Sequence, residues 1–288
     1  MTGRTEIGRI GIWSGELRFG EAGAVRDAAA ELDELGFGAV WIPGGVGGDV
    51  FGDVERLLLA TKRTTIATGI INVWKHEPVE VGDWWHGLAS DQQARLMLGF
   101  GISHAPLIGA EYRAPLTNMR AYLDGLDSAR LPVNRRCLAA LGPKMLELAR
   151  DRTAGAHPYL VMPEHTAFAR EILGPDALLA PEQGVILETD PDKARAIARA
   201  TIADYLGMSN YTDNWRRFGF TDEDVTQVSD RLMDALFAWG TPEQIARRIE
   251  AHFAAGADHV CLQVVRGSVM KFTDPPLEAW RTLAALLL

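Results

Sequence analysis

Cysteine is scarce in this sequence: its 288 residues include two, Cys137 and Cys261. They lie far apart, each within an apolar run, which excludes a disulfide framework and indicates free thiols in a reducing compartment. The sequence also lacks an apolar signal region after Met1 and any apolar stretch near the roughly 18 residues that span a bilayer. We therefore expect a cytoplasmic protein with no membrane partner.

Basic residues are outnumbered by acidic ones. The chain has 29 Lys and Arg against 38 Asp and Glu, a formal net charge of -9. An acidic surface repels phosphate backbones, so nucleic acid is not an expected partner. The hydrophobic fraction of 47% is that of a globular protein with a large core.

Several catalytic motifs are missing. There is no Walker loop, no Gly-x-Ser-x-Gly elbow, no His-x-His pair on the first strand and no His-Glu-x-x-His. The dinucleotide fingerprint that could start at Gly45 has Val50 in place of its third glycine, and the one that could start at Gly99 has His104 there. The sequence thus predicts neither a nucleotide loop nor a catalytic metal.

Short apolar runs alternate with amphipathic stretches along nearly the whole chain, which predicts βαβ units and a parallel sheet. Eight strands at a spacing of about 30 residues favour a closed (β/α)8 TIM barrel, folded as one domain over residues 1–288. The polar and aromatic segment Gly207–Asp230 breaks the alternation, and we interpret it as a helical insertion between the seventh and eighth units. The predicted strands are Ile10–Trp13, Ala39–Pro43, Thr65–Val73, Leu96–Gly101, Cys137–Leu141, Ala156–Val161, Gly184–Leu187 and Val260–Val265.

Helix signals lie between these strands. Apolar residues recur at helical spacing, and Asp or Thr followed by Pro marks two helix starts, at Asp190 and Thr241. Thr117 is the expected N-cap of another helix. The predicted helices are Glu21–Leu35, Val54–Thr61, Thr117–Ala129, one from Asp190 to about Leu206, and one after Thr241 that ends before Gly256.

The ends of the predicted strands are rich in aromatic residues and glycine. In a (β/α)8 barrel the carboxyl ends of the strands form the active face. Aromatic side chains can stack on a flat conjugated cofactor, and glycines let the backbone approach it. The segments concerned are Trp13, Trp41–Gly45, Gly69–Trp74, Gly101–His104, Leu141–Met145 and His157–Val161.

Two of these ends suggest specific chemistry. The Gly142-Pro143-Lys144-Met145 turn could hold a phosphate on free N–H groups at a helix start, with Lys144 beside them, or could simply be a tight βα turn. His157 and Tyr159 share one strand face, so both reach the barrel mouth if that face points into the lumen.

Together these segments resemble the luciferase-like (β/α)8 flavin and deazaflavin oxidoreductases, and most closely the actinobacterial probable coenzyme F420-dependent oxidoreductases. The resemblance extends from about Ile7 to the C-terminus. It is carried by Ala39–Pro43, Ala67–Trp74, Leu98–His104, Leu138–Leu146 and Gly155–Val161.

The resemblance implies roles for particular residues. A non-prolyl cis peptide at Gly69-Ile70 would press against the cofactor ring, with Asn72 at its polar edge. The Gly142–Met145 turn would hold the cofactor phosphate, and Ser103 and His104 would lie near the substrate or the ring. We include Trp41 and Gly101 among the cofactor-binding residues. The candidate proton donors are His104 and His157.

The chain departs from the family where the second strand ends. F420 reductases have an Asp-His pair there, whereas this chain has Pro43-Gly44-Gly45. The leading hypothesis is therefore an F420-dependent oxidoreductase that passes a hydride between the deazaflavin C5 and an unidentified small organic substrate. An FMN-dependent luciferase-like monooxygenase and a non-redox ligand-binding member remain alternatives.

Two further expectations concern the surroundings of the barrel. The polyanionic F420 tail would need cations near the mouth beyond Lys144, such as Lys62, Lys75 or Arg113. A homodimer is expected from the family, with Val81–Trp85 as a possible contact patch. Packing within the monomer would explain those tryptophans as well.

Overall fold

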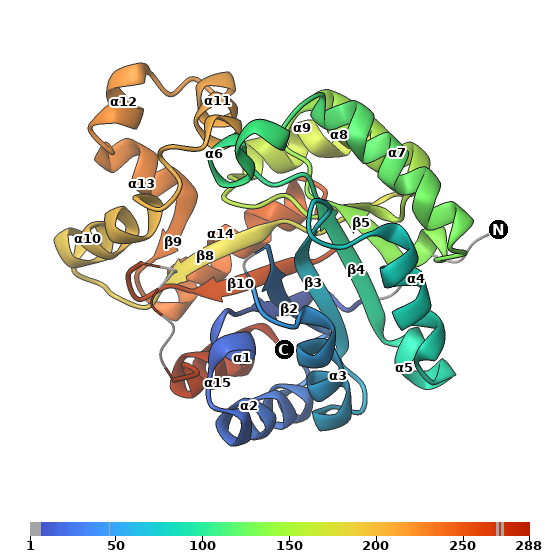
Figure 1. The fold of residues 1–288 in the computed structure, drawn as a ribbon. Helices are drawn as coiled ribbons and strands as arrows, with labels where there is room; N and C mark the ends of the chain where they lie inside the picture. The colour runs from blue at the N-terminus through green and yellow to red at the C-terminus, as the bar shows by residue number, and fades with distance from the viewer. Residues whose placement is uncertain (1–6, 46, 269–270, 272–273) are drawn as a thin grey trace.

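A parallel sheet forms the centre of the molecule (Figure 1). The computed structural model describes residues 7–45, 47–268, 271 and 274–288. Among these residues ten strands pair in the order β7-β6-β5-β4-β3-β2-β1-β10-β8-β9. The strands are β1 (Ile10–Trp13), β2 (Ala39–Gly44), β3 (Thr65–Asn72), β4 (Leu96–Gly101), β5 (Arg136–Leu138), β6 (Gly155–Ala156), β7 (Leu178–Leu179), β8 (Glu182–Ile186), β9 (Phe237–Trp239) and β10 (Val260–Val264).

The sheet closes on itself through one continuous segment. Strand β7 pairs with β6, and β8, which begins three residues after β7 ends, pairs with β10. Between them the N–H of Ala180 donates to Ala156, and Pro181 accepts from the N–H of Cys261. The chain from 178 to 186 is therefore one bent barrel strand with neighbours on both sides. The predicted TIM-barrel class is confirmed.

Helices surround the barrel (Figure 1). Their bounds are α1 (Glu16–Phe19), α2 (Ala22–Leu35), α3 (Val50–Ala60), α4 (Pro78–Gly87), α5 (Ser90–Ala94), α6 (Ala105–Ile108), α7 (Pro115–Ser128), α8 (Pro143–Arg152), α9 (Pro163–Leu173), α10 (Pro191–Ile202), α11 (Ser209–Arg217), α12 (Asp222–Thr226), α13 (Asp230–Leu236), α14 (Pro242–Ala254) and α15 (Leu277–Leu287), with 3-10 turns at Gly109–Glu111 and Val133–Arg135. None of the helices in the described part of the chain has the length and apolar composition needed to cross a membrane.

Local sequence sets the helix ends. The Asp190 carboxylate accepts from two N–H groups at the start of α10, and Thr241 forms a capping box with Gln244 at the start of α14. Helix α2 ends at Gly36 in the left-handed region, as predicted. The N-cap predicted at Thr117 is wrong: α7 begins at Pro115, whose fixed φ suits the first helical position.

Strand β6 is shorter than the sequence predicts. It ends at Ala156, whereas the prediction ran to Val161. Leu160 has a positive φ of 53°. Its N–H donates to the Glu182 carboxylate rather than to a neighbouring strand. His157 and Pro158 still bond to Leu138 and Glu182 of the neighbouring strands, and the chain leaves the sheet after them to contact α11 at Leu160.

The segment predicted as an insertion is helical. Helices α11, α12 and α13 lie beside α10 and β9 in Figure 1. Trp215 of α11 is fully buried, and its Nε1 donates to the carbonyl of Leu160. Tyr211 and Phe220 belong to the same hydrophobic cluster. These helices thus pack on the chain that leaves β6.

The tryptophans of α4 pack within this chain. Trp85 is 3% exposed, and Trp84 stacks on Phe51 at 4.6 Å and donates to Glu55. Gly82 lies against Ala129. Of the two readings of Val81–Trp85, this packing supports the intramolecular one, and the homodimer stays a prediction.

Candidate active site at the barrel mouth

The peptide bond between Gly69 and Ile70 is cis, at the position that the family resemblance implies. The register of β3 shifts here against both β2 and β4. The carbonyl that follows the cis bond is pressed against β2, where a Cβ on Gly44 would lie 2.6 Å from Ile70 O. The Ile70 side chain lies over Gly101. Glycine at 44 and 101 thus makes room for the bulge.

Two unpartnered ring nitrogens converge on Gly69. A Cβ on this glycine would lie 2.5 Å from Trp13 Nε1 and 3.0 Å from His157 Nε2. Both atoms are buried and have no hydrogen-bond partner among the described residues. A side chain at position 69 would fill the space next to these two nitrogens. Because residue 69 is glycine, only backbone atoms lie there.

Asn72 supplies a third unsatisfied group. It is 1% exposed, and its Oδ1 accepts the N–H of Trp74 at 3.0 Å. That contact fixes the amide so that Nδ2 is the free end, and Nδ2 has no partner in the described chain. A buried amide N–H without a partner is costly, so it marks a place for an acceptor. This fits the predicted position of Asn72 at the polar edge of a ring.

Trp41 lies inside the barrel and is directed away from the mouth. It is fully buried, stacks on His157 at 4.1 Å, and donates from Nε1 to His259 at 3.1 Å. His259, just before β10, bonds in turn to the carbonyl of Gly8. These contacts engage the indole in the lumen, and the expected cofactor-binding role of Trp41 stays a prediction.

His157 is also part of the lumen. Its Nδ1 lies 2.7 Å from the carbonyl of Ala180, so Nδ1 carries the proton and Nε2 is a lone pair. Burial lowers its pKa to about 4. At neutral pH His157 is thus a neutral imidazole that presents an acceptor toward Gly69. Its proposed role as a proton donor stays a prediction, and this geometry favours His104 for that role.

His104 lies higher at the mouth, directly before α6. Its ring is 5.1 Å from that of Tyr211 on α11, and its Nδ1 has no partner among the described residues. Burial lowers its pKa, and a hydrogen bond with Asn210 opposes this shift. Ser103 beside it has a positive φ of 59°. The helices after α10 therefore supply neighbours to the predicted site.

The predicted phosphate turn is the start of α8, and it has a cation that the sequence did not reveal. Gly142 is the N-cap, Pro143 is at N1, and Lys144 is exposed. Met145 uses its N–H in a bond to the carbonyl of Gly142. A guanidinium nitrogen of Arg217, at the end of α11, lies 3.9 Å from the Cβ position of Gly142. The sequence could not bring Arg217 here, because it is 75 residues away.

Tyr159, whose position at the mouth was expected, lies there with three polar residues that the sequence did not point to: Tyr205, Gln263 and Glu182. Tyr159 donates to Oε1 of Gln263 at 2.7 Å, and its hydroxyl lies 2.9 Å from that of Tyr205. Glu182, 1% exposed, accepts the N–H of Leu160 with one oxygen, while the other has no partner in the described residues. Burial raises the pKa of Glu182 to about 8.

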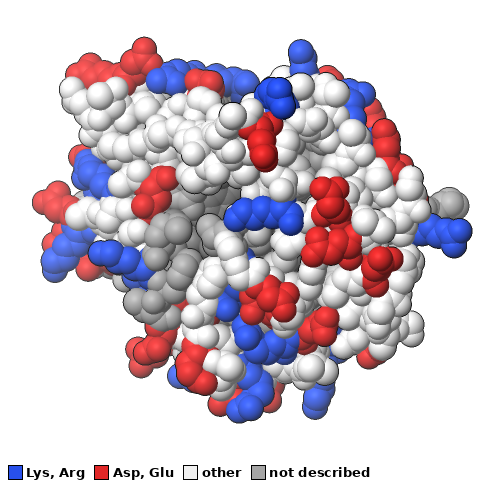
Figure 2. Space-filling view, viewed as in Figure 1, with Lys and Arg blue, Asp and Glu red and all other residues white. Residues whose placement is uncertain are grey.

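A cavity of about 330 Å³ opens beside these groups, at the ends of β1 and β10. Trp13, Gln263 and Lys271 are among its walls. The face of the molecule in Figure 2 is hollowed near its centre and carries interspersed acidic and basic groups. Lys75 and Arg113 follow β3 and β4 at this end of the barrel. Lys62 precedes β3 and lies at the opposite end, so it cannot serve a cofactor at the mouth.

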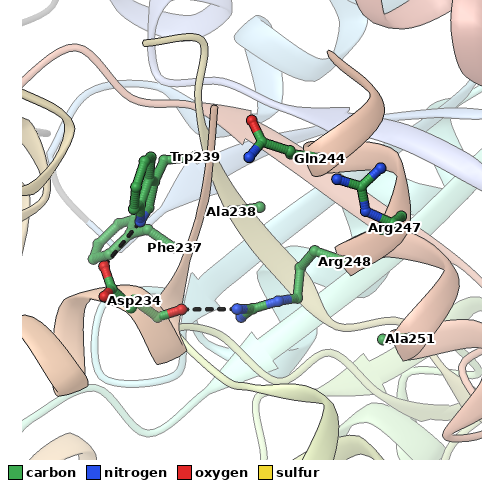
Figure 3. Close-up of a pocket in the computed structure, with 8 residues that line it drawn as sticks. All are labelled: Asp234, Phe237, Ala238, Trp239, Gln244, Arg247, Arg248 and Ala251. Carbon is green, nitrogen blue, oxygen red and sulfur yellow. Dashed lines mark hydrogen bonds between the residues drawn. The ribbon is translucent and has the colours of Figure 1, made fainter. Parts of the chain in front are cut away.

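A second depression, of about 280 Å³, lies on the outer wall between α13, β9 and α14 (Figure 3). Among its polar groups, Asp234 accepts from Trp239, and Arg248 donates to the carbonyl of Asp234. None of the predicted site residues lines it. No three His, Cys, Asp or Glu side chains of the described residues are grouped so that they could hold a metal ion.

Comparison with known proteins gives matches in structure and none in sequence. No family model and no curated protein sequence matches the chain. An F420-dependent secondary alcohol dehydrogenase, solved with an F420-acetone adduct, is 14% identical, with a TM-score of 0.71 over 97% of this chain and 98% of that one. The coenzyme F420-dependent tetrahydromethanopterin reductase of Methanopyrus kandleri is 15% identical, with a TM-score of 0.68 over 96% and 98%.

A flavin enzyme matches at a similar level. The oxygenating constituent of 3,6-diketocamphane monooxygenase from Pseudomonas putida, solved with FMN, is 15% identical, with a TM-score of 0.64 over 97% of this chain and 99% of that one. These likenesses establish the fold. The chain has the luciferase-like (β/α)8 barrel of F420-dependent and flavin-dependent enzymes, as the sequence resemblance predicts.

Proposed function

We propose that this protein is an oxidoreductase that binds coenzyme F420 at the mouth of the barrel and acts on a small organic substrate. The observation that carries the proposal is a set of buried nitrogens without partners among the described residues: Trp13 Nε1 and His157 Nε2, which converge on Gly69, and Asn72 Nδ2 at the end of β3. These buried nitrogens can bond to the polar edges of a flat ring. The neighbouring glycines have no side chains, so the ring can approach the backbone.

The chain supplies binding and orientation, and a bound deazaflavin would supply hydride transfer at its C5. Asn72 would donate from Nδ2 to the ring edge, since its Oδ1 is held by Trp74. The start of α8, with Lys144 and Arg217, would hold the phosphate. Tyr211 beside His104 would limit water at the reacting face. His104 is the preferred candidate for moving a proton there.

FMN is the second candidate cofactor. An FMN-binding monooxygenase shares the fold, and FMN carries a phosphate that the same helix start could bind. F420 is favoured because cations extend beyond that turn, with Lys75 and Arg113 exposed at the same end of the barrel. The absence of a side chain at Gly44 supports a third reading, a ligand-binding protein without redox turnover. Against it, Gly44 has a structural reason, the contact with Ile70 O.

The test is an equilibrium titration of the purified protein with F420 and, separately, with FMN, followed by fluorescence. We expect F420 to bind more tightly, and Asn72→Leu to weaken it about ten-fold through the lost hydrogen bonds. Asn134→Leu is the control, since Asn134 lies in the 3-10 turn before β5, at the opposite end of the barrel. Preference for FMN would move the protein to the monooxygenase reading, and binding of neither would overturn the proposal.

A further inference from the structure

We propose that the cavity at the ends of β1 and β10 is the substrate compartment and that it takes a small oxo acid, whose carbonyl oxygen is bound by the amide of Gln263 and whose carboxylate is bound by Lys271. This inference rests on the proposed function, because it places the substrate next to the predicted ring site. The cavity and that site share one wall, Trp13, which lines the cavity and directs Nε1 at Gly69.

The orientation of Gln263 is fixed by a chain of hydroxyl groups. Tyr159 gives its one proton to Oε1 of Gln263, so the contact between Tyr159 and Tyr205 must have Tyr205 as donor. With Oε1 engaged, the amide nitrogen is the free end of this 7% exposed side chain. That nitrogen makes no hydrogen bond to any described residue, and Gln263 lines the cavity. The cavity therefore has a preorganised N–H donor.

Two carboxylates near the cavity, those of Glu16 and Asp204, already accept hydrogen bonds. Glu16 accepts from Ser14 at 2.7 Å and from Arg266 at 2.9 Å. The Asp204 carboxylate accepts from Ser268 at 2.8 Å. Ligand hydroxyls and ammonium groups would thus find no free acceptor on these side chains.

The cavity wall carries a positive charge that no described residue neutralises. Lys271 forms no ion pair with a described residue and lines the cavity, whereas the charge of Arg266 is balanced by Glu16. One neutral donor and one cation select a molecule with an oxygen acceptor and an anionic group. A carbonyl and a carboxylate on one short chain satisfy both, and the cavity volume of about 330 Å³ suits a molecule of this size.

Three probes of equal chain length separate the two contacts: 2-oxohexanoate, hexanoate and 2-hexanone, each titrated into the protein by calorimetry and by ligand-observed NMR. We expect 2-oxohexanoate to bind most tightly. Gln263→Leu should weaken 2-oxohexanoate and 2-hexanone about ten-fold and leave hexanoate unchanged, whereas Lys271→Met should weaken the two acids alone. Lys62→Met, before β3 at the opposite end of the barrel and outside the cavity, is the matched control.

Tyr159→Phe is a second variant that leaves Gln263 in place. It removes the proton that holds Oε1, so the amide can turn, and affinity for 2-oxohexanoate should fall less than in Gln263→Leu. Equal binding of all three probes, or no binding, overturns the inference. Titration of F420 into the same samples separates the two claims: cofactor binding without oxo-acid binding refutes this inference alone, and oxo-acid binding without cofactor binding refutes the proposed function alone.

Discussion

The carbonyl oxygen of Ile70 lies against the α-carbon of Gly44, where a Cβ would come within 2.6 Å of it. The end of the second strand therefore cannot carry a side chain while the third strand has its cis bulge in this position. Glycine at position 44 is therefore a packing requirement of this barrel, whereas a Cβ at position 45 would meet no neighbour.

Gly44→Ala should destabilise the fold and disturb the bulge. Because the methyl group meets backbone atoms, which cannot rotate away, we expect a loss of about 1–3 kcal/mol in the free energy of unfolding, measured by urea denaturation. Gly45→Ala is the control, since a Cβ there has no neighbour within 4 Å. Equal stability of the two variants would contradict this account of position 44.

Arg217→Met should weaken binding of the phosphate and leave the ring contacts intact. We expect FMN affinity to fall about ten-fold while riboflavin, which has the ring without the phosphate, is bound as before. Arg216→Met is the neighbouring control, because the Arg216 guanidinium is held by Asp213 and Asp222. A parallel loss for FMN and riboflavin would show that Arg217 acts through the ring site or the fold.

Glu182→Gln should raise the free energy of unfolding, and this gain should grow as the pH rises. Burial raises the folded-state pKa of Glu182 to about 8, above its ordinary value of 4.5, so between these two values the folded chain keeps a proton that the unfolded chain has released. Stability then falls as pH rises through that window, by up to about 3–5 kcal/mol from this group. We expect the gain in Glu182→Gln to be absent below pH 4.5 and complete above pH 8. Urea denaturation across this range measures it, with the exposed Glu171→Gln as control.

His157 should make the folded protein less stable in acid, which is the opposite pH dependence to that of Glu182. Its pKa is lowered from 6.5 to about 4, so between these values the unfolded chain binds a proton that the folded chain does not. Stability is therefore lost as pH falls from 6.5 to 4, and His157→Gln should reduce that slope by up to about 1.4 kcal/mol per pH unit. His86→Gln, at the surface, should leave the slope unchanged. An unaltered slope in His157→Gln would show that this imidazole is not kept neutral by the lumen.

Once a substrate is known, His104→Ala and His157→Ala separate the two candidate proton donors. We expect His104→Ala to lower turnover by about 10²-fold or more, the range of a general acid. His157→Ala should act mainly on stability, because its proton is held by Ala180. Full turnover in both variants would exclude both residues as the acid.

The sequence anticipated a large part of the fold and one feature of the site in detail. Alternating apolar and amphipathic segments predicted the barrel, and β1 and β4 have the predicted bounds. The two-residue strand β7 and the three-residue strand β9 were missed, since such short segments carry no periodic pattern. The cis peptide at Gly69-Ile70 came from the resemblance and could not have come from residue pattern.

Sequence by itself determined which segments alternate, where several helices begin and end, and which glycines would lie at the strand ends, because these depend on neighbours within a few residues. The tertiary structure decided what surrounds each side chain. In the folded chain Trp41 lies in the lumen, where it bonds to His259. Tyr159, after one strand, bonds to Gln263 of another at 2.7 Å, and Arg217 lies next to Gly142. These relations depend on closure of the barrel and on packing of α11, which unite residues far apart in the chain and have no signature in local composition.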